Sequence, residues 1–428
     1  MRRIVTVIFV LNIVSALLFI NFVSRPVYDD AYNIVDVHNY AANGVSVDSL
    51  LAQKRPPGPT AFIWMAAGVR LLRGDELKDA RIAALASWIL LVLAVLVGAK
   101  LSRCQELWYS ALVTLLVFPH AVMTTATVLT EGPALLFAAL GALAWLAFAS
   151  AGDSLALGIF GGLSMGIAVT CRQYYLALLL AAGGFAFLHW KKQPSKENLE
   201  LLKKVLLSLV VACLPVIVVV LIWHGISCPN SASASSSNNV WKATIGLNIT
   251  RPLVAAFYVA VYFVPFTFPA IFRVKQAQRR IVLLIAVVAG IVISHFSSLL
   301  LQPGPLKSVV GIASRLHSTA GKVLFAIICI VTIYNAAATY LLAWDLRETL
   351  FQCAPAVFSL LLVAFFVAEQ IGVGGNLPFY DRYALQVAPF MGLIAFALLP
   401  QLTAARMVVL GSLSVFSHFM LWRYAFPR

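Results

Sequence analysis

The sequence contains little charge. Only 11% of its 428 residues are Asp, Glu, Lys or Arg, whereas 61% are hydrophobic; an average soluble domain has roughly a quarter charged residues. This composition excludes a protein whose whole surface faces water. Acidic residues are the scarcer kind, and 16 Asp and Glu against 31 Lys and Arg give a formal net charge of +15. In a membrane protein, basic residues serve orientation and lipid contact first, so this charge does not indicate a nucleic-acid partner.

Three further patterns are missing. The six cysteines are scattered and form no CxxC or metal-ligand spacing, which disfavours a disulfide framework or a zinc site. The apolar runs show no alternation with a period of two, and this excludes membrane-spanning strands. We find no internal repeat, which disfavours a transporter built from duplicated halves.

Long apolar runs recur along the whole chain, and each is long enough to cross about 30 Å of hydrocarbon as a helix. The first run follows Met1-Arg2-Arg3 and lacks a small-residue cleavage site, as in a retained signal anchor. The others lie near residues 80–101, 107–122, 132–150, 155–171, 173–190, 204–224, 252–272, 281–300, 320–344, 352–371, 384–400 and 406–422. The sequence therefore predicts an all-α polytopic membrane protein, with one transmembrane domain over residues 1–428 and about 11–13 transmembrane helices.

An N-terminus in the cytoplasm puts the short basic loops on the inner side, as the positive-inside rule requires. The first outer loop, residues 23–79, is then the largest polar region and is too short to form a soluble domain. Residues 30–40 and 46–53 read as short interfacial helices, and residues 58–72 as an apolar half-length segment. We expect this extracytoplasmic loop to fold against the membrane.

Asp29 and Asp30 follow the first span directly. A pair of charges this close to the hydrocarbon edge is costly to bury and often functional, and a carboxylate can act as a general base. The alternative is a structural one, in which the pair caps a helix that begins at Ala31.

Basic residues on the same side could hold a phosphate. Lys54 and Arg55 precede a rigid Pro-Pro-Gly turn, and Arg172 separates two spans that are joined by almost no loop. An arginine in that position must find an anion, either a carboxylate of another loop or a ligand phosphate. The alternative for Lys54 and Arg55 is a turn without a functional role.

Two more charged positions lie at outer ends of spans. Glu131 opens an otherwise uncharged span, where it can face a cavity or stabilise the start of the helix through the helix dipole. Asp381 and Arg382 precede the penultimate span, and they can take part in the site or pair with other charges.

The order of these motifs resembles the GT-C glycosyltransferases, multi-span enzymes that use polyprenyl-phosphate sugars on the lumenal or periplasmic side. The motifs that carry the resemblance are Tyr28–Tyr32, Tyr40–Gly44, Pro56–Gly58, Thr130–Pro133, Cys171–Gln173 and Tyr380–Tyr383. The Asp pair, the Pro-Pro-Gly turn and the Arg-Gln pair look similar to the dolichyl-phosphate-glucose α-1,2-glucosyltransferase. The segment around Glu131 looks more like the protein O-mannosyltransferase and aminoarabinose-transferase branch. The chain departs from the pattern where Asp replaces the commoner second Glu and where the following His is absent.

The resemblance implies a hexosyltransferase in a bacterial inner membrane or an ER membrane, with its active site on the periplasmic or lumenal side. We predict transfer of a sugar from a polyprenyl-phosphate donor to a glycan, lipid or protein acceptor, without a nucleic-acid partner. Asp30 is the first choice of base and Asp29 the second. The residues expected to bind substrate or phosphate are Lys54, Arg55, Arg172, Arg382, Glu131 and Asp381. The chemistry requires no cofactor, although Mg²⁺ or Mn²⁺ could bind if Asp29, Asp30 and Glu131 converge.

The alternative function is a transporter or flippase for a lipid-linked or anionic substrate. Such a protein would place its functional charges at the middle of the bilayer. Here the acidic residues of interest lie at the outer ends of spans, which favours the enzyme.

Overall fold

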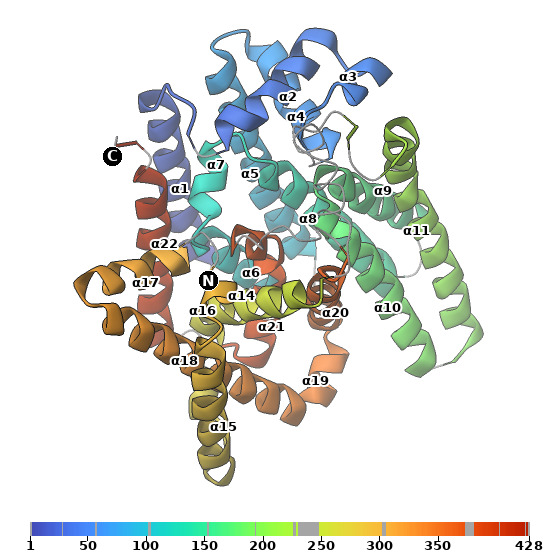
Figure 1. The fold of residues 1–428 in the computed structure, drawn as a ribbon. Coiled ribbons are helices and arrows are strands. Elements are labelled where there is room, and N and C mark those ends of the chain that lie inside the picture. Colours follow the sequence, from blue (N-terminus) through green and yellow to red (C-terminus); the bar gives the residue numbers. More distant parts are fainter. Residues whose placement is uncertain are drawn as a thin grey trace.

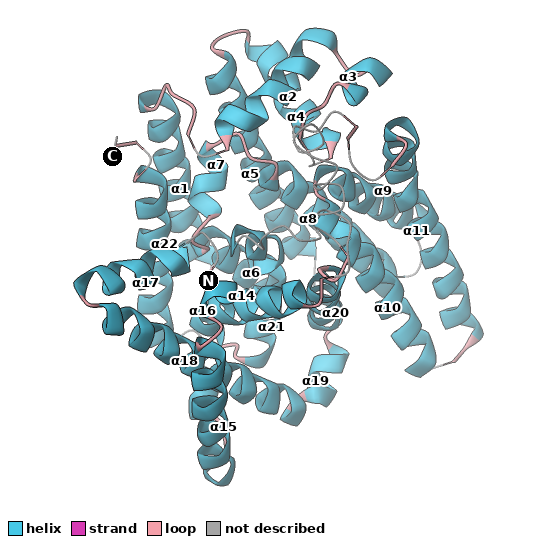
Figure 2. Ribbon diagram, viewed as in Figure 1, coloured by secondary structure: helices cyan, strands magenta, loops and turns pink. Residues whose placement is uncertain are grey.

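The computed structural model describes residues 2–27, 29–55, 58–101, 104–151, 154–192, 194–225, 228–229, 248–301, 305–372, 381–401, 403–423 and 425–426. Every regular element within these ranges is a helix (Figure 1, Figure 2). Parts of three motifs named above lie outside the described residues, namely the Pro56-Pro57 turn, Tyr28 and Tyr380.

The helices of the N-terminal half are α1 (Arg2–Phe22), α2 (Asp30–Asn43), α3 (Val47–Leu51), α4 (Pro59–Leu72), α5 (Glu76–Leu101), α6 (Gln105–Val117), α7 (Ala121–Ala126), α8 (Glu131–Ala151), α9 (Leu155–Cys171), the 3-10 helix η1 (Gln173–Tyr175), α10 (Leu176–Lys192) and α11 (Lys196–Trp223). Those of the C-terminal half are α14 (Thr250–Thr267), η2 (Phe268–Phe272), α15 (Gln276–Ser294), α16 (Ser297–Leu300), α17 (Pro305–Leu316), α18 (Ser318–Asp345), α19 (Arg347–Gln352), α20 (Ala354–Glu369), η3 (Asp381–Val387), α21 (Ala388–Leu398) and α22 (Ala404–Trp422).

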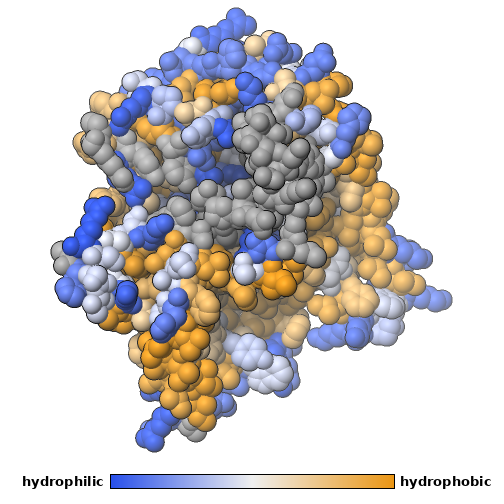
Figure 3. Space-filling model, in the orientation of Figure 1, coloured by the Kyte–Doolittle hydropathy of each residue, from blue (hydrophilic) through white to orange (hydrophobic). Residues whose placement is uncertain are grey.

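The predicted class, an all-α polytopic membrane protein, is confirmed. Seven helices within the described ranges are long and apolar enough to cross a membrane, namely α1, α5, α8, α11, α14 with η2, α18 and α22. Shorter apolar helices include α4, α9 and α20. The face of the molecule in Figure 3 is hydrophobic over its lower part and hydrophilic at the top, where Figure 1 places α2, α3 and α4.

The predicted span at residues 107–122 is interrupted. Helix α6 ends at Val117, and the short α7 begins only at Ala121. Pro119 lies between them, and proline has no N–H for the helix ladder and clashes with the preceding turn. The chain thus breaks inside the bundle before it reaches α8.

Close backbone contacts hold α9 against α11. A Cβ atom on Gly162 would lie 2.2 Å from the carbonyl oxygen of Ser208, and one on Gly166 would lie 2.0 Å from that of Ala212. Only glycine permits such an approach, the usual way in which small residues join helices in membranes. This contact fixes the direction of α9, and therefore the position of Arg172 at its end.

The short helices expected in the first loop are present as α2 and α3, and the expected apolar segment is α4. The loop is attached to the bundle by specific bonds. Trp223 at the end of α11 donates from Nε1 to the carbonyl oxygen of Leu50 at 3.0 Å, and Thr60 pairs with Thr170 at 2.8 Å between their Oγ1 atoms. The loop therefore packs on the helix ends, and its expected position against the membrane stays a prediction.

Candidate active site

Four charged side chains from distant parts of the sequence meet at one end of the bundle. Arg382 Nη1 donates to Asp29 Oδ2 at 2.6 Å, and Arg172 Nη2 donates to Glu131 Oε1 at 2.6 Å. Arg382 Nε lies 3.8 Å from the same Glu131 oxygen, so the two ion pairs are connected. We call these four residues the acid–arginine cluster. The structure thus brings together Asp29, Glu131, Arg172 and Arg382, all predicted from the sequence.

Each member occupies the end of an element. Asp29 precedes α2, Glu131 is the first residue of α8, Arg172 follows α9, and Arg382 lies in η3. Arg172 leaves the helix because its backbone is extended, and this conformation turns its side chain toward α8. The cluster therefore depends on the mutual placement of four chain segments.

The cluster is largely closed to solvent, with one exception. The side chain of Glu131 is 0% exposed, and those of Arg172 and Arg382 are 8% and 9% exposed, but that of Asp29 is 33% exposed. Asp29 stands at the N-cap position of α2, yet its side chain makes no capping bond with the helix. The structural alternative for Asp29 is therefore disfavoured, and its carboxylate is the one that a ligand can reach.

Aromatic rings and a further arginine extend the site. The Tyr383 ring lies under both guanidinium groups, 5.8 Å from Arg172 Cζ and 5.7 Å from Arg382 Cζ, in the range of cation–π attraction. Its centroid is 4.8 Å from that of Tyr174, whose hydroxyl accepts a hydrogen bond of 3.0 Å from Arg251 Nη2.

Sequence reasoning missed Arg251, which is buried at the start of α14. A signal was present, because a charged residue at the edge of an apolar run is often functional.

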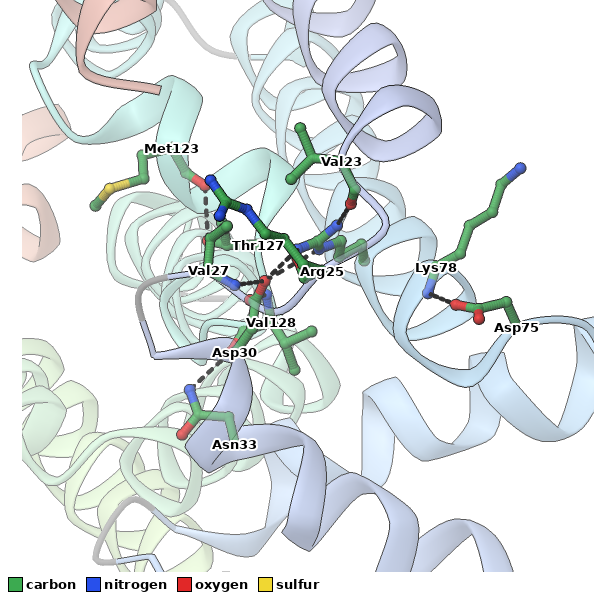
Figure 4. Close-up of polar contacts among 11 residues, drawn as sticks. Val23, Arg25, Val27, Asp30, Asn33, Asp75, Lys78, Met123, Thr127 and Val128 are labelled. Atoms are coloured by element: carbon green, nitrogen blue, oxygen red, sulfur yellow. Dashed lines mark hydrogen bonds and ion pairs between the residues drawn. The ribbon is translucent and has the colours of Figure 1, made fainter. Parts of the chain in front are cut away.

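Asp30, the first choice of base, lies elsewhere. Its carboxylate is fully buried and pairs with Arg81 at 2.5 Å. It also accepts hydrogen bonds from the backbone N–H groups of Val27 at 3.2 Å and Val128 at 2.6 Å (Figure 4). Burial raises the pKa of Asp30, and Arg81 together with these backbone donors opposes the rise. No acceptor can reach this carboxylate without disrupting the contacts around it.

Lys54 and Arg55 lie beside α2. The backbone N–H of Lys54 donates to Asp36 Oδ1 at 2.7 Å, and the Arg55 guanidinium stands 4.2 Å over the Tyr32 ring. These contacts lie within the first loop and not at the acid–arginine cluster. Asp381 begins η3 next to Arg382, and its side chain lies outside the described part of the chain.

Several buried polar atoms near Glu131 have no hydrogen-bond partner within the described residues. They are Thr130 Oγ1, Glu131 Oε2, Arg172 Nε and the Tyr175 hydroxyl. Buried polar groups usually find a partner, so such a group of orphans requires an explanation, such as a role in catalysis or an unseen water.

A metal site is not evident in this region. Asp30 is turned away from Asp29 and Glu131, and the described residues contain no group of three or more His, Cys, Asp or Glu side chains that could hold a metal ion. Metal dependence was left open by the sequence, and the expectation that the chemistry requires no cofactor stays a prediction.

The chain is similar to known proteins in part of its sequence and in the outline of its structure. Residues 54–223 match the family model of dolichyl-phosphate-mannose-protein mannosyltransferases. No curated protein sequence is significantly similar to the chain.

Among solved structures, the chain is similar to ArnT from Cupriavidus metallidurans in the apo state, with a TM-score of 0.41, 16% identity, and coverage of 97% of this chain and 77% of that one. For the same ArnT bound to undecaprenyl phosphate, the TM-score is 0.42 and the identity is 15%, with coverage of 96% of this chain and 77% of that one. For the arabinosyltransferase EmbB from Mycobacterium smegmatis, the TM-score is 0.39 and the identity is 13%, with coverage of 98% of this chain and 40% of that one. These similarities are of outline only.

The matched family segment begins at Lys54 and contains both Glu131 and Arg172. The chain is thus similar, over less than half of its length, to a family of membrane glycosyltransferases, in agreement with the class predicted from the sequence.

Proposed function

We propose that the chain transfers one sugar from a polyprenyl-phosphate donor to a hydroxyl acceptor, and that the reaction takes place at the acid–arginine cluster. One observation carries the proposal. A partly exposed carboxylate, Asp29, lies within hydrogen-bond distance of an arginine, Arg382, that also approaches a second carboxylate–arginine pair. A base and two cations are the groups that glycosyl transfer from a phosphate requires.

Asp29 takes the role of base in this proposal, in place of Asp30. The acceptor oxygen attacks the anomeric carbon of the sugar and gives its proton to the Asp29 carboxylate. The bond between that carbon and the phosphate oxygen breaks, and its electron pair leaves with the polyprenyl phosphate. Asp29 is suited to this because it is the exposed carboxylate of the cluster.

Arg382 and Arg172 stabilise the departing phosphate. In the structure their charges are balanced by Asp29 and Glu131. A phosphate offers more negative charge and more acceptor oxygens than one carboxylate, so it competes well for an arginine. When Arg382 turns toward the phosphate, Asp29 is released to receive the acceptor proton. Lys54 and Arg55, which lie beside α2, supply further positive charge to the loop that contains Asp29.

The test of this function is a transfer assay with the purified chain in lipid nanodiscs. Polyprenyl-phosphate-linked hexoses and pentoses serve as donors, and a membrane lipid extract serves as acceptor. We expect release of free polyprenyl phosphate together with a glycosylated product for one of the donors. Movement of an intact sugar lipid between the leaflets of vesicles, with no donor cleaved, would instead favour the transporter.

The active site is proposed to face the extracytoplasmic side. The basic C-terminal end of α10, with Lys191 and Lys192, would then be cytoplasmic, as the positive-inside rule requires. A cysteine in place of Val47, which is exposed on α3, should react with an impermeant thiol reagent in intact cells. Glu197→Cys at the start of α11 is the matched inner control and should react only after permeabilisation. The reverse pattern would place the site in the cytoplasm.

A further inference from the structure

Arg81 holds the junction between the first span and α2. It lies in the second turn of α5 and is almost fully buried. Its Nη1 donates to the carbonyl oxygen of Val23, and its Nη2 donates to that of Arg25 at 2.9 Å. The Nε and Nη2 groups also donate to Asp30 Oδ2, at 3.1 and 2.5 Å. One guanidinium therefore fixes the end of the first span and the start of α2 against α5.

Asp30 connects this junction to a second segment. Its other oxygen, Oδ1, accepts the backbone N–H of Val128 at 2.6 Å. The carbonyl oxygen of Val128 accepts a hydrogen bond of 2.7 Å from Asn33 Nδ2, one turn further along α2. Figure 4 shows Asp30 and Asn33 close to Val128, with these hydrogen bonds as dashed lines. Asp30 and Asn33 thus bind both the backbone N–H and the backbone carbonyl group of Val128, which lies in the segment before α8.

These contacts lie next to both carboxylates of the acid–arginine cluster. Asp29 is the chain neighbour of Asp30, and Glu131 follows Val128 by three residues. Arg382 approaches both acids, at 2.6 Å and 3.8 Å, and it can do so only while their separation is maintained. We infer that Asp30, Arg81 and Asn33 are positioning residues that set the distance between Asp29 and Glu131. This inference rests on the proposed function.

If these residues act by positioning, their replacement should lower the reaction rate by a measurable factor. Misplacement of a reacting group by about 1 Å can lower a rate by about 10²-fold although no reacting atom has been removed. Arg81→Lys keeps the charge but cannot serve Val23, Arg25 and Asp30 together, because an ammonium lacks the planar fork of donors. Asn33→Ala removes only the bond to the Val128 carbonyl.

The experiment measures kcat and the donor KM per folded molecule, with thermal stability followed in parallel. We expect Arg81→Lys and Asn33→Ala to lower kcat by about 10- to 10²-fold and to change the donor KM much less, since the arginines that hold phosphate are intact. Arg406→Lys is the matched control. Arg406 is also buried, and it donates to the carbonyl oxygens of Leu399, Gln401 and Phe266 at the opposite end of α21 from η3. Its replacement should lower stability without lowering kcat per folded molecule.

Double variants with Asp29→Asn distinguish the possible failures. If Arg81 and Asn33 act through Asp29, their replacement should add little to the loss that Asp29→Asn causes alone. Effects that multiply would overturn the positioning role, as would a wild-type kcat in both Arg81→Lys and Asn33→Ala. An Asp29→Asn enzyme with full activity would instead refute the role of Asp29 as base in the proposed function, on which the inference rests.

Discussion

Replacing Asp29 by asparagine is expected to lower turnover by about 10²-fold or more, the scale usual for loss of a general base. Asparagine has nearly the same shape, and its oxygen can still accept the hydrogen bond from Arg382, but it cannot take a proton from the acceptor hydroxyl. Because the Asp29 side chain makes no capping bond to α2, the thermal stability should stay near that of the wild type. Initial rates at saturating donor, together with thermal unfolding in detergent, measure the two effects.

Asp48→Asn is the control for this substitution. Asp48 lies in the first turn of α3, in the same loop, and its side chain is exposed, so its replacement should leave turnover unchanged. Full activity in Asp29→Asn would move the base to another acid, with Glu131 and Asp381 the next candidates.

The largest combined loss of stability and activity is expected for Arg172→Ala. This change removes the nearer arginine from the Glu131 carboxylate, which is 0% exposed, and leaves it the more distant Arg382 at 3.8 Å. Breaking a buried ion pair from one side costs about 3–5 kcal/mol, so the midpoint of thermal unfolding should fall markedly. Donor use should fall as well, because the arginine is proposed to stabilise the leaving phosphate.

A double variant separates these two roles of Arg172. Arg172→Gln combined with Glu131→Gln removes both charges and should regain most of the stability, since no buried charge is left unpaired. It should not regain donor use. Arg347→Ala serves as the control, because Arg347 is exposed on α19 and bonds only locally, to the Trp344 carbonyl oxygen at 3.0 Å. Recovery of normal donor use in the double variant would leave Arg172 with a structural role only.

The helical framework could be predicted because it depends on local properties of the chain. Membrane spans follow from the length of apolar runs, and α4 begins at Pro59, a favoured residue in the first turn. The interruption after α6 was not predicted, although Pro119 marks it. Hydropathy averages over a window and therefore passes across a single proline.

The roles of the two adjacent aspartates could not be assigned from the sequence. Both follow the first span, and both fit a base or a helix cap. Their difference comes from partners far away in the chain: Asp30 pairs with Arg81 and Val128, whereas Asp29 pairs with Arg382. Such partners are fixed by tertiary packing, which no local pattern records.

Arg172 illustrates the same limit. Its position between two closely joined spans indicated that it needs an anion, and a protein carboxylate and a ligand phosphate were equally open. In the structure that anion is Glu131. The proposal adds that the same arginine serves the phosphate when the donor is bound.

The most direct test of the central claim is the position of the phosphate in an experimental structure of the chain with a polyprenyl phosphate bound. The account predicts phosphate oxygens within hydrogen-bond distance of Arg382 or Arg172, with the Asp29 carboxylate released from Arg382 and facing the same space. A phosphate bound elsewhere, with the Asp29–Arg382 pair intact, would contradict it.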